Sequence, residues 1–191
     1  MLTGNILFTN TRSDSNAPDL QLMYSPAVPT ALAGVFNFDF PVSIFISILV
    51  QPQSRGTVSL RSANPQDTPI INPNYLQEQA DVETLVKAVE LARELMNTKS
   101  FAEYYDGEIV PGPDADLEKF VRGNASTIWH PVGTCKMGCD NLAVVDPALK
   151  VHGLEGLRVA DASIMPTVTS GNTYAASVMI GEKLVDMVLA D

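Results

Sequence analysis

Apolar side chains recur at steps of three and four residues in two long stretches of the chain. In residues 81–97 the periodic positions are Val82, Leu85, Val86, Val89, Ala92 and Met96. In residues 174–189 they are Ala175, Val178, Met179, Val185, Val188 and Leu189. One face of an amphipathic helix has this period, so both stretches are predicted to be helices. Asp81 stands at the N-cap of the first, and Gly171 and Asn172 precede the second, where a cap belongs.

Runs rich in Ile, Val, Phe and Thr predict the strands. Residues 42–50 and 57–61 are two such runs around the turn-rich residues 51–56, which favours a hairpin. Residues 19–24 form a further short strand after a loop at residues 13–18. Residues 116–122 are a short helix that ends before Gly123. Because strands and helices mix without a strict βαβ order, the predicted fold class is α+β with an antiparallel sheet.

Composition and charge narrow the class of protein. The chain has 191 residues, of which 46% are hydrophobic and 18% are charged, so a folded globular protein is expected. Its formal net charge of −10 repels phosphate backbones and anionic headgroups. Nucleic acid is therefore not an expected partner.

Membrane and export signals are weak. The longest apolar stretch, residues 36–50, is interrupted by Asp39 and Pro41 and is too short for a membrane span. Residues 1–10 lack the basic and apolar regions of a signal peptide. The cysteines, Cys135 and Cys139, lie in one local segment, which does not fit a disulfide-stapled secreted scaffold. The expected location is the cytoplasm.

The candidates for chemistry begin with the histidines, His130 and His152. On composition alone, His130 beside a tryptophan and a proline favours a structural histidine, and His152 favours a solvated loop. Together with the two cysteines they could supply four metal ligands, but the spacing does not match the paired knuckles of structural zinc. No metal site is predicted. Phosphate-binding glycine motifs and the G-x-S-x-G elbow of serine hydrolases do not occur.

Four ordered blocks resemble the carboxy-terminal part of the glucose-methanol-choline (GMC) oxidoreductases, the flavoprotein family of choline dehydrogenases, aryl-alcohol oxidases and glucose oxidases. QPQSRGTVSLRS with INPNYL (51–62 and 71–76) resembles a strand pair of the family's substrate domain. HPVGTCKMG (130–138) resembles its histidine block. Residues 145–166 resemble the strand that returns to the flavin domain, and GNT with MIGEK (171–173 and 179–183) resembles the closing helix.

The resemblance implies a division of the chain. Residues 1–126 would form an antiparallel substrate-binding domain flanked by helices. Residues 127–191 would carry the histidine block. They would also carry a terminal strand at residues 157–161 and a terminal helix, which together complete an FAD-binding domain. The family's amino-terminal part, which holds the ADP half of FAD, has no match in this sequence. The expectation is a truncated or split product, or a partner polypeptide that supplies this part.

The resemblance also implies a reaction. In the family, an alcohol gives its hydroxyl proton to a base and its hydride to flavin N5, which leaves an aldehyde or ketone. His130 matches the base, and histidine suits this task because it exchanges protons near neutral pH. Asn172 matches the second active-site position, where an amide can hydrogen-bond the substrate oxygen. Asp161, with Ala162, matches positions near the ribityl and phosphate groups, and the backbone of Asn172 and Thr173 would face the flavin edge.

Several alternatives stay open. Without the family, Asp161 is a turn residue that ends a strand. Trp129 either walls the substrate cavity or belongs to the core, and Cys135 fits a packed turn without a redox role. The chain could instead be a non-catalytic fragment or interaction module without FAD, or a hydroxynitrile lyase on the same scaffold. Apolar surface on residues 157–160 and on the last helix predicts self-association.

Overall fold

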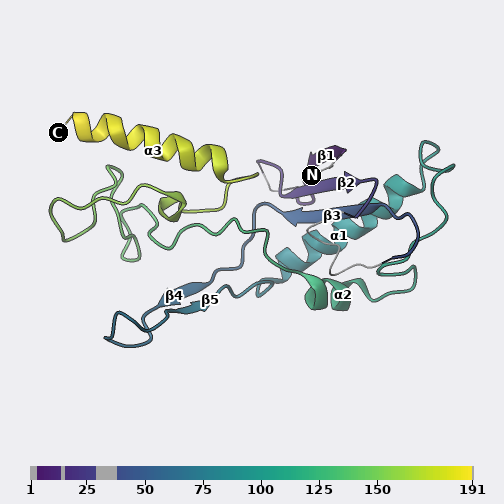
Figure 1. The fold of residues 1–191 in the computed structure, drawn as a ribbon, viewed down its shortest axis with the longest axis horizontal. Helices are drawn as coiled ribbons and strands as arrows, with labels where there is room; N and C mark the ends of the chain where they lie inside the picture. The colour runs from purple at the N-terminus through teal and green to yellow at the C-terminus, as the bar shows by residue number, and fades with distance from the viewer. Residues whose placement is uncertain (1–3, 14–15, 29–37, 191) are drawn as a thin grey trace. The chain divides into compact units, whose positions relative to one another are not determined.

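The structure, a computed structural model, describes residues 4–13, 16–28 and 38–190 (Figure 1). Over these residues it has two small antiparallel sheets and three α-helices, which confirms the α+β prediction. The chain divides into two compact units, Met1–Ser54 with Leu76–Ser126 and Arg55–Tyr75 with Thr127–Asp191. Parts of two predicted segments, the loop at 13–18 and the apolar stretch at 36–50, lie outside the described residues.

The first unit is a three-stranded sheet covered by a helix. Its strands are β1 (Asn5–Thr9), β2 (Leu20–Ser25) and β3 (Ile44–Leu49), in the order β1-β2-β3. Leu20 and Leu22 of the central strand are fully buried, and α1 (Gln79–Met96) packs against β2 and β3 (Figure 1). The strands predicted at 19–24 and 42–50 are confirmed with small changes at their ends.

The predicted hairpin between residues 42–50 and 57–61 is wrong. β3 pairs with β2, whereas β4 (Thr57–Ser59) pairs with β5 (Ile70–Asn72), the strand pair that the family resemblance implied. The physical reason is a long-range contact. The carboxylate of Asp81 accepts hydrogen bonds from the backbone N–H groups of Gln53 and Ser54, at 2.7 and 2.8 Å. These bonds hold the connection against α1 instead of letting it fold into a tight turn.

The same contact corrects the predicted cap of α1. The N-cap is Glu78, whose side chain makes no capping bond, and Asp81 lies inside the first turn. The hydroxyl of Ser54 accepts the hydrogen bond of the Glu78 N–H at 3.1 Å. The start of α1 is therefore capped by residues more than twenty positions earlier in the chain. A window of local sequence cannot contain this partner.

The second short helix follows its sequence signals more closely. α2 (Leu117–Asn124) begins after Asp116, whose carboxylate accepts the Lys119 N–H at 3.0 Å. The helix predicted at 116–122 is confirmed, although it continues through Gly123. No helix in the part of the chain that the structure describes is both long and apolar enough to cross a membrane.

The second unit has a small core with little regular structure around it. Buried Val145, Leu149, Ile164, Met165 and Ile180 form this core. The helix predicted at 174–189 is confirmed as α3 (Tyr174–Leu189), which packs on the core, but its N-cap is Thr173 rather than Gly171 or Asn172.

The predicted terminal strand at residues 157–161 is wrong. Within the described residues this segment makes one isolated antiparallel bridge, between Arg158 and Lys150. Two backbone bonds form it, from the Val159 N–H to the Leu149 carbonyl and from the Val151 N–H to the Leu157 carbonyl. A strand needs a neighbour that bonds along its length, and here the chain turns at Asp161 into the 3₁₀ helix η2 (Ala162–Ile164).

Candidate active site

The side chains of His130 and Asn172 lie together, although 42 residues separate them in the chain. Nε2 of His130 is 3.3 Å from Nδ2 of Asn172. A carboxamide nitrogen can only donate, so in this arrangement the imidazole Nε2 is unprotonated and accepts with its lone pair. Turning the carboxamide around would present its oxygen to a protonated ring. The pair can therefore serve both protonation states of an acid–base histidine.

The turn before His130 has an uncommon backbone. Trp129 has a φ of +63°, in the left-handed region. Its N–H donates to the hydroxyl oxygen of Thr127 at 3.0 Å. The Trp129 side chain is 82% exposed, so the alternative that it is a core residue does not hold for this structure. His130 itself is half-buried.

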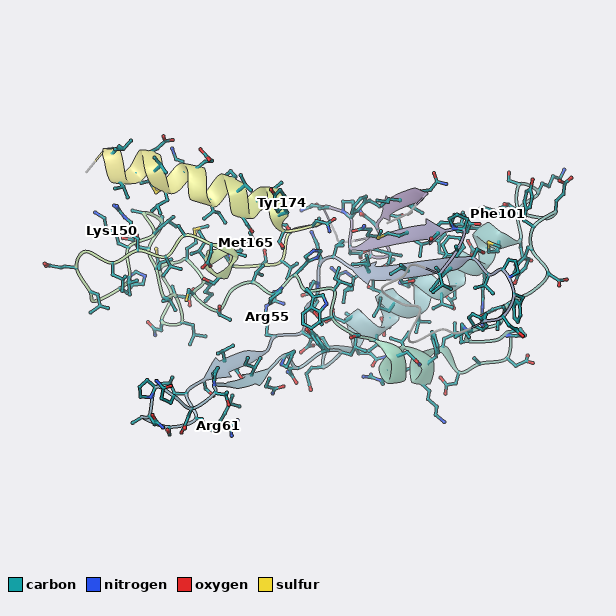
Figure 2. All side chains as sticks on the ribbon, in the orientation of Figure 1. Arg55, Arg61, Phe101, Lys150, Met165 and Tyr174 are labelled. Carbon is teal, nitrogen blue, oxygen red and sulfur yellow. The ribbon has the colours of Figure 1, made fainter. Side chains whose placement is uncertain are left out.

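The segment before Asn172 is also a hydrogen-bonded turn. The Gly171 N–H donates to the Thr169 carbonyl at 2.7 Å, and the Thr169 hydroxyl donates to the Gly171 carbonyl at 3.1 Å. Thr173 follows as the buried N-cap of α3 and makes no side-chain capping bond. The first amides of α3 and the positive end of its dipole favour negative charge at this place. Figure 2 shows Tyr174 at this end of the helix.

Asp161 has a local structural task. One carboxylate oxygen accepts the Ser163 N–H at 2.7 Å and so caps η2. The hydrogen bonds that the Ser163 hydroxyl and backbone donate hold the pKa of Asp161 below its usual value. The neighbouring Ala162 is half-buried and packs against the core of the unit. The cofactor contacts predicted for Asp161 and Ala162 stay predictions.

The other candidates for chemistry lie in hydrogen-bonded turns. The N–H of Cys135 donates to the Ser163 carbonyl at 2.9 Å, which ties the histidine block to η2. The ring of His152 is exposed and its Nε2 lies 3.1 Å from the Gly138 carbonyl. Among the residues that the structure describes, no three His, Cys, Asp or Glu side chains gather as a metal site requires.

Comparison with known proteins points to one family. The family model described as GMC oxidoreductase matches residues 52–181, which include the His130–Asn172 pair. An alcohol dehydrogenase (acceptor) of Pseudomonas putida is 38% identical over 98% of this chain and 35% of its own length. An oxygen-dependent choline dehydrogenase of Klebsiella pneumoniae is 48% identical over 71% of this chain and 25% of its own length.

Solved structures agree with the sequence comparisons. A pyridoxine 4-oxidase from Mesorbium loti matches 97% of this chain and 38% of its own, with 30% identity and a TM-score of 0.81. A fungal aryl-alcohol oxidase matches 91% of this chain and 28% of its own, with 29% identity and a TM-score of 0.75. The chain thus spans about a third of the length of the proteins that it resembles.

Proposed function

The chain belongs to the GMC oxidoreductase family, and on this premise we propose that it forms the carboxy-terminal part of an FAD-dependent enzyme that oxidises the CH–OH group of an alcohol to an aldehyde or ketone. The observation that carries the proposal is the contact between His130 and Asn172, 3.3 Å apart at the start of α3. It lies inside the region that the family model matches.

In this proposal the two side chains divide the work. When the Asn172 carboxamide turns from the ring to the oxygen of the substrate, the lone pair on Nε2 of His130 is released and accepts the hydroxyl proton of the substrate. An amide takes no proton at neutral pH, so Asn172 orients the alcohol and stabilises the charge that grows on its oxygen. The protonated imidazole then keeps a partner if the carboxamide turns its oxygen toward the ring.

The chain's residues fit one end of the cofactor. FAD, when bound, supplies the acceptor for the hydride. The N-terminal amides of α3, which no side chain caps, suit the anionic edge of a flavin, with the backbone of Asn172 and Thr173 beside it. Asp161 and Ala162 would lie toward the ribityl chain. The sequence contains no G-x-G-x-x-G turn for the pyrophosphate, so we propose that an upstream part or a partner polypeptide supplies it.

The test compares the two histidines of the chain. In the FAD-loaded protein, His130→Ala should slow the loss of flavin absorbance on addition of an alcohol by about 10²- to 10⁴-fold. His152→Ala is the matched control, because this ring is exposed and its Nε2 lies against the Gly138 carbonyl, so its loss should leave the rate within about twofold of wild type. Equal rates in His130→Ala and wild type would refute His130 as the base.

A non-catalytic module is the second candidate, and the lack of a G-x-G-x-x-G turn in this sequence favours it for the chain by itself. The absorbance spectrum of the chain combined with the part that holds the pyrophosphate, after mixing with FAD, separates the two. Flavin bands that stay with the protein and bleach with an alcohol support the enzyme. Release of benzaldehyde from mandelonitrile without bleaching would instead reveal a hydroxynitrile lyase.

A further inference from the structure

We infer that Thr127 is a positioning residue, whose hydroxyl holds the left-handed turn at Trp129 that presents His130 to Asn172. The inference deepens the proposed function, because it concerns the presentation of the proposed base. Thr127 touches neither His130 nor Asn172 through the bonds described above. It acts through the backbone of Trp129.

The backbone of Trp129 needs something to hold it. A bulky residue at a φ of +63° is an outlier, since the left-handed region brings Cβ against the next carbonyl oxygen. Packing within this chain does not compensate, because Trp129 is 82% exposed. The bond from the Trp129 N–H to the Thr127 hydroxyl, at 3.0 Å, holds the peptide plane from which the left-handed turn starts. Ser and Thr close turns over two residues in this way.

The turn fixes the direction from which the imidazole approaches. His130 is followed by Pro131, and a residue before proline is confined to extended backbone. With His130 restricted on that side, the remaining adjustable torsions lie at Trp129. The Thr127 bond fixes the peptide plane from which these torsions start, so the left-handed setting of Trp129 carries His130 in one direction. The 3.3 Å approach of Nε2 to the Asn172 carboxamide therefore depends on a hydroxyl three residues earlier.

The first experiment removes and restores the hydroxyl. Thr127→Val should slow flavin reduction in the FAD-loaded protein by about 10- to 100-fold, the size of effect expected from a small misplacement of a reacting group. Thr127→Ser keeps the acceptor and should stay within about threefold of wild type. Thr98→Val is the matched control, because it removes a threonine hydroxyl bonded to the Leu95 carbonyl at 2.8 Å in the other unit.

A second readout does not depend on turnover. In the wild-type chain, nuclear Overhauser effects should connect the His130 ring protons with the Asn172 side-chain amide protons. We expect these effects to vanish in Thr127→Val and to persist in Thr127→Ser. Trp129 is the single tryptophan of the chain, so its fluorescence reports the same turn without interference. Thr127→Ala serves as a second removal of the hydroxyl if the valine variant does not fold.

A double-mutant cycle tests whether Thr127 acts on His130 through the backbone of Trp129. Glycine has no Cβ to restrict its φ, so in Trp129→Gly the backbone at position 129 can readjust when the Thr127 bond is lost. The loss caused by Thr127→Val should therefore shrink severalfold in the Trp129→Gly background. An equal loss in both backgrounds, or an unchanged Overhauser pattern in Thr127→Val, overturns the inference. A wild-type protein that shows the pattern but reduces no flavin with alcohols would refute the proposed function and leave the positioning role intact.

Discussion

Short polar side chains hold together the part of the second unit that has no regular structure. Thr127 accepts the Trp129 N–H, Asp161 accepts the Ser163 N–H, and Asp146 accepts the N–H groups of Ala148 and Lys150. Each bond satisfies a backbone donor that a helix or sheet would otherwise satisfy. The geometry around His130 and Asn172 therefore depends on individual side chains rather than on a ladder of backbone bonds.

Asp161 gives a prediction with a defined pH dependence. Its pKa is lowered in the folded protein from the ordinary value of 3.8 by the hydrogen bonds of Ser163. A lowered carboxyl pKa stabilises the fold above the unfolded pKa, and this contribution is lost as pH falls through the folded pKa. Asp161→Ala should lower the free energy of unfolding by about 0.5–1 kcal/mol at pH 7, because the carboxylate caps η2 at an exposed position. The difference from wild type in thermal melting should shrink below the folded pKa, where the carboxyl is a neutral acceptor.

Asp161→Asn is the companion variant, since an amide oxygen can still accept the Ser163 N–H but carries no charge. Its melting temperature should lie between those of wild type and Asp161→Ala at neutral pH. A difference between Asp161→Ala and wild type that stays constant down to strongly acidic pH would contradict the role assigned to the ionised carboxylate.

The site residues differ in how far the sequence could identify them. Composition alone favoured a structural role for His130, and the family resemblance is what singled out His130 and Asn172, which the structure places in contact. Thr127 was missed, because a threonine two residues before a tryptophan produces neither a helical nor a strand pattern. The sequence feature that could have identified Thr127 is the T-x-W-H-P spacing. This spacing can be interpreted only once the left-handed backbone of Trp129 is known.

At the scale of elements, local patterns predicted where helices lie better than how they begin. The helix at 174–189 was predicted with its observed bounds, since its period depends on its own residues. The start of α1 was mispredicted because its cap comes from Ser54. The hairpin was mispredicted for the same reason, since the partner of β3 is β2 and not the next strand. Pairings and caps that join distant segments leave no periodic trace in the sequence.

The contact of Asp81 with the Gln53 and Ser54 amides gives a prediction for α1. Asp81 is 1% exposed, and its carboxylate bonds to both N–H groups. Asp81→Ala should lower the free energy of unfolding by about 2–4 kcal/mol, because two backbone donors lose a charged acceptor. Urea unfolding followed by circular dichroism measures this loss. Glu83→Gln is the control, as it changes an exposed carboxylate on the same helix and should stay within about 0.5 kcal/mol.

The base of the β4–β5 pair gives a second prediction at this scale. A Cβ on Gly56 would collide with the carbonyl oxygen of Asn72 and lie 2.7 Å from that of Pro73. Gly56→Ala must therefore push the two chain segments apart, at a cost of about 1–3 kcal/mol. Faster amide exchange in β4 and β5 is the expected result. Gly123→Ala in α2 meets no atom within 4 Å and should be neutral or stabilising, so similar exchange in both variants would contradict the steric reason.

At the scale of the whole molecule, some residues of the periodic apolar pattern are not buried by the unit to which they belong. α3 turns Ile180, Leu184 and Met187 toward the core of its unit. It also carries Val178, Val185 and Leu189, which are 47%, 54% and 82% exposed. The hydrophobic period of α3 was visible in the sequence, but not which of its apolar sides the unit would cover. Which side of α3 is buried depends on the other segments of the chain that pack against it.

The exposed side of α3 leads to a prediction about the state of the chain in solution. Contiguous apolar surface of this kind drives association, so the chain by itself should form dimers or larger species in sedimentation velocity. The double variant Val178→Lys with Val185→Lys should shift it toward monomer, because two charges would have to be desolvated on contact. Asp186→Lys is the matched control, since it changes the net charge by the same two units at a position that is already polar. If association were governed by the net charge of −10 rather than by apolar contact, both variants would change it alike. A monomeric wild-type chain would show that the exposed residues of α3 do not self-associate.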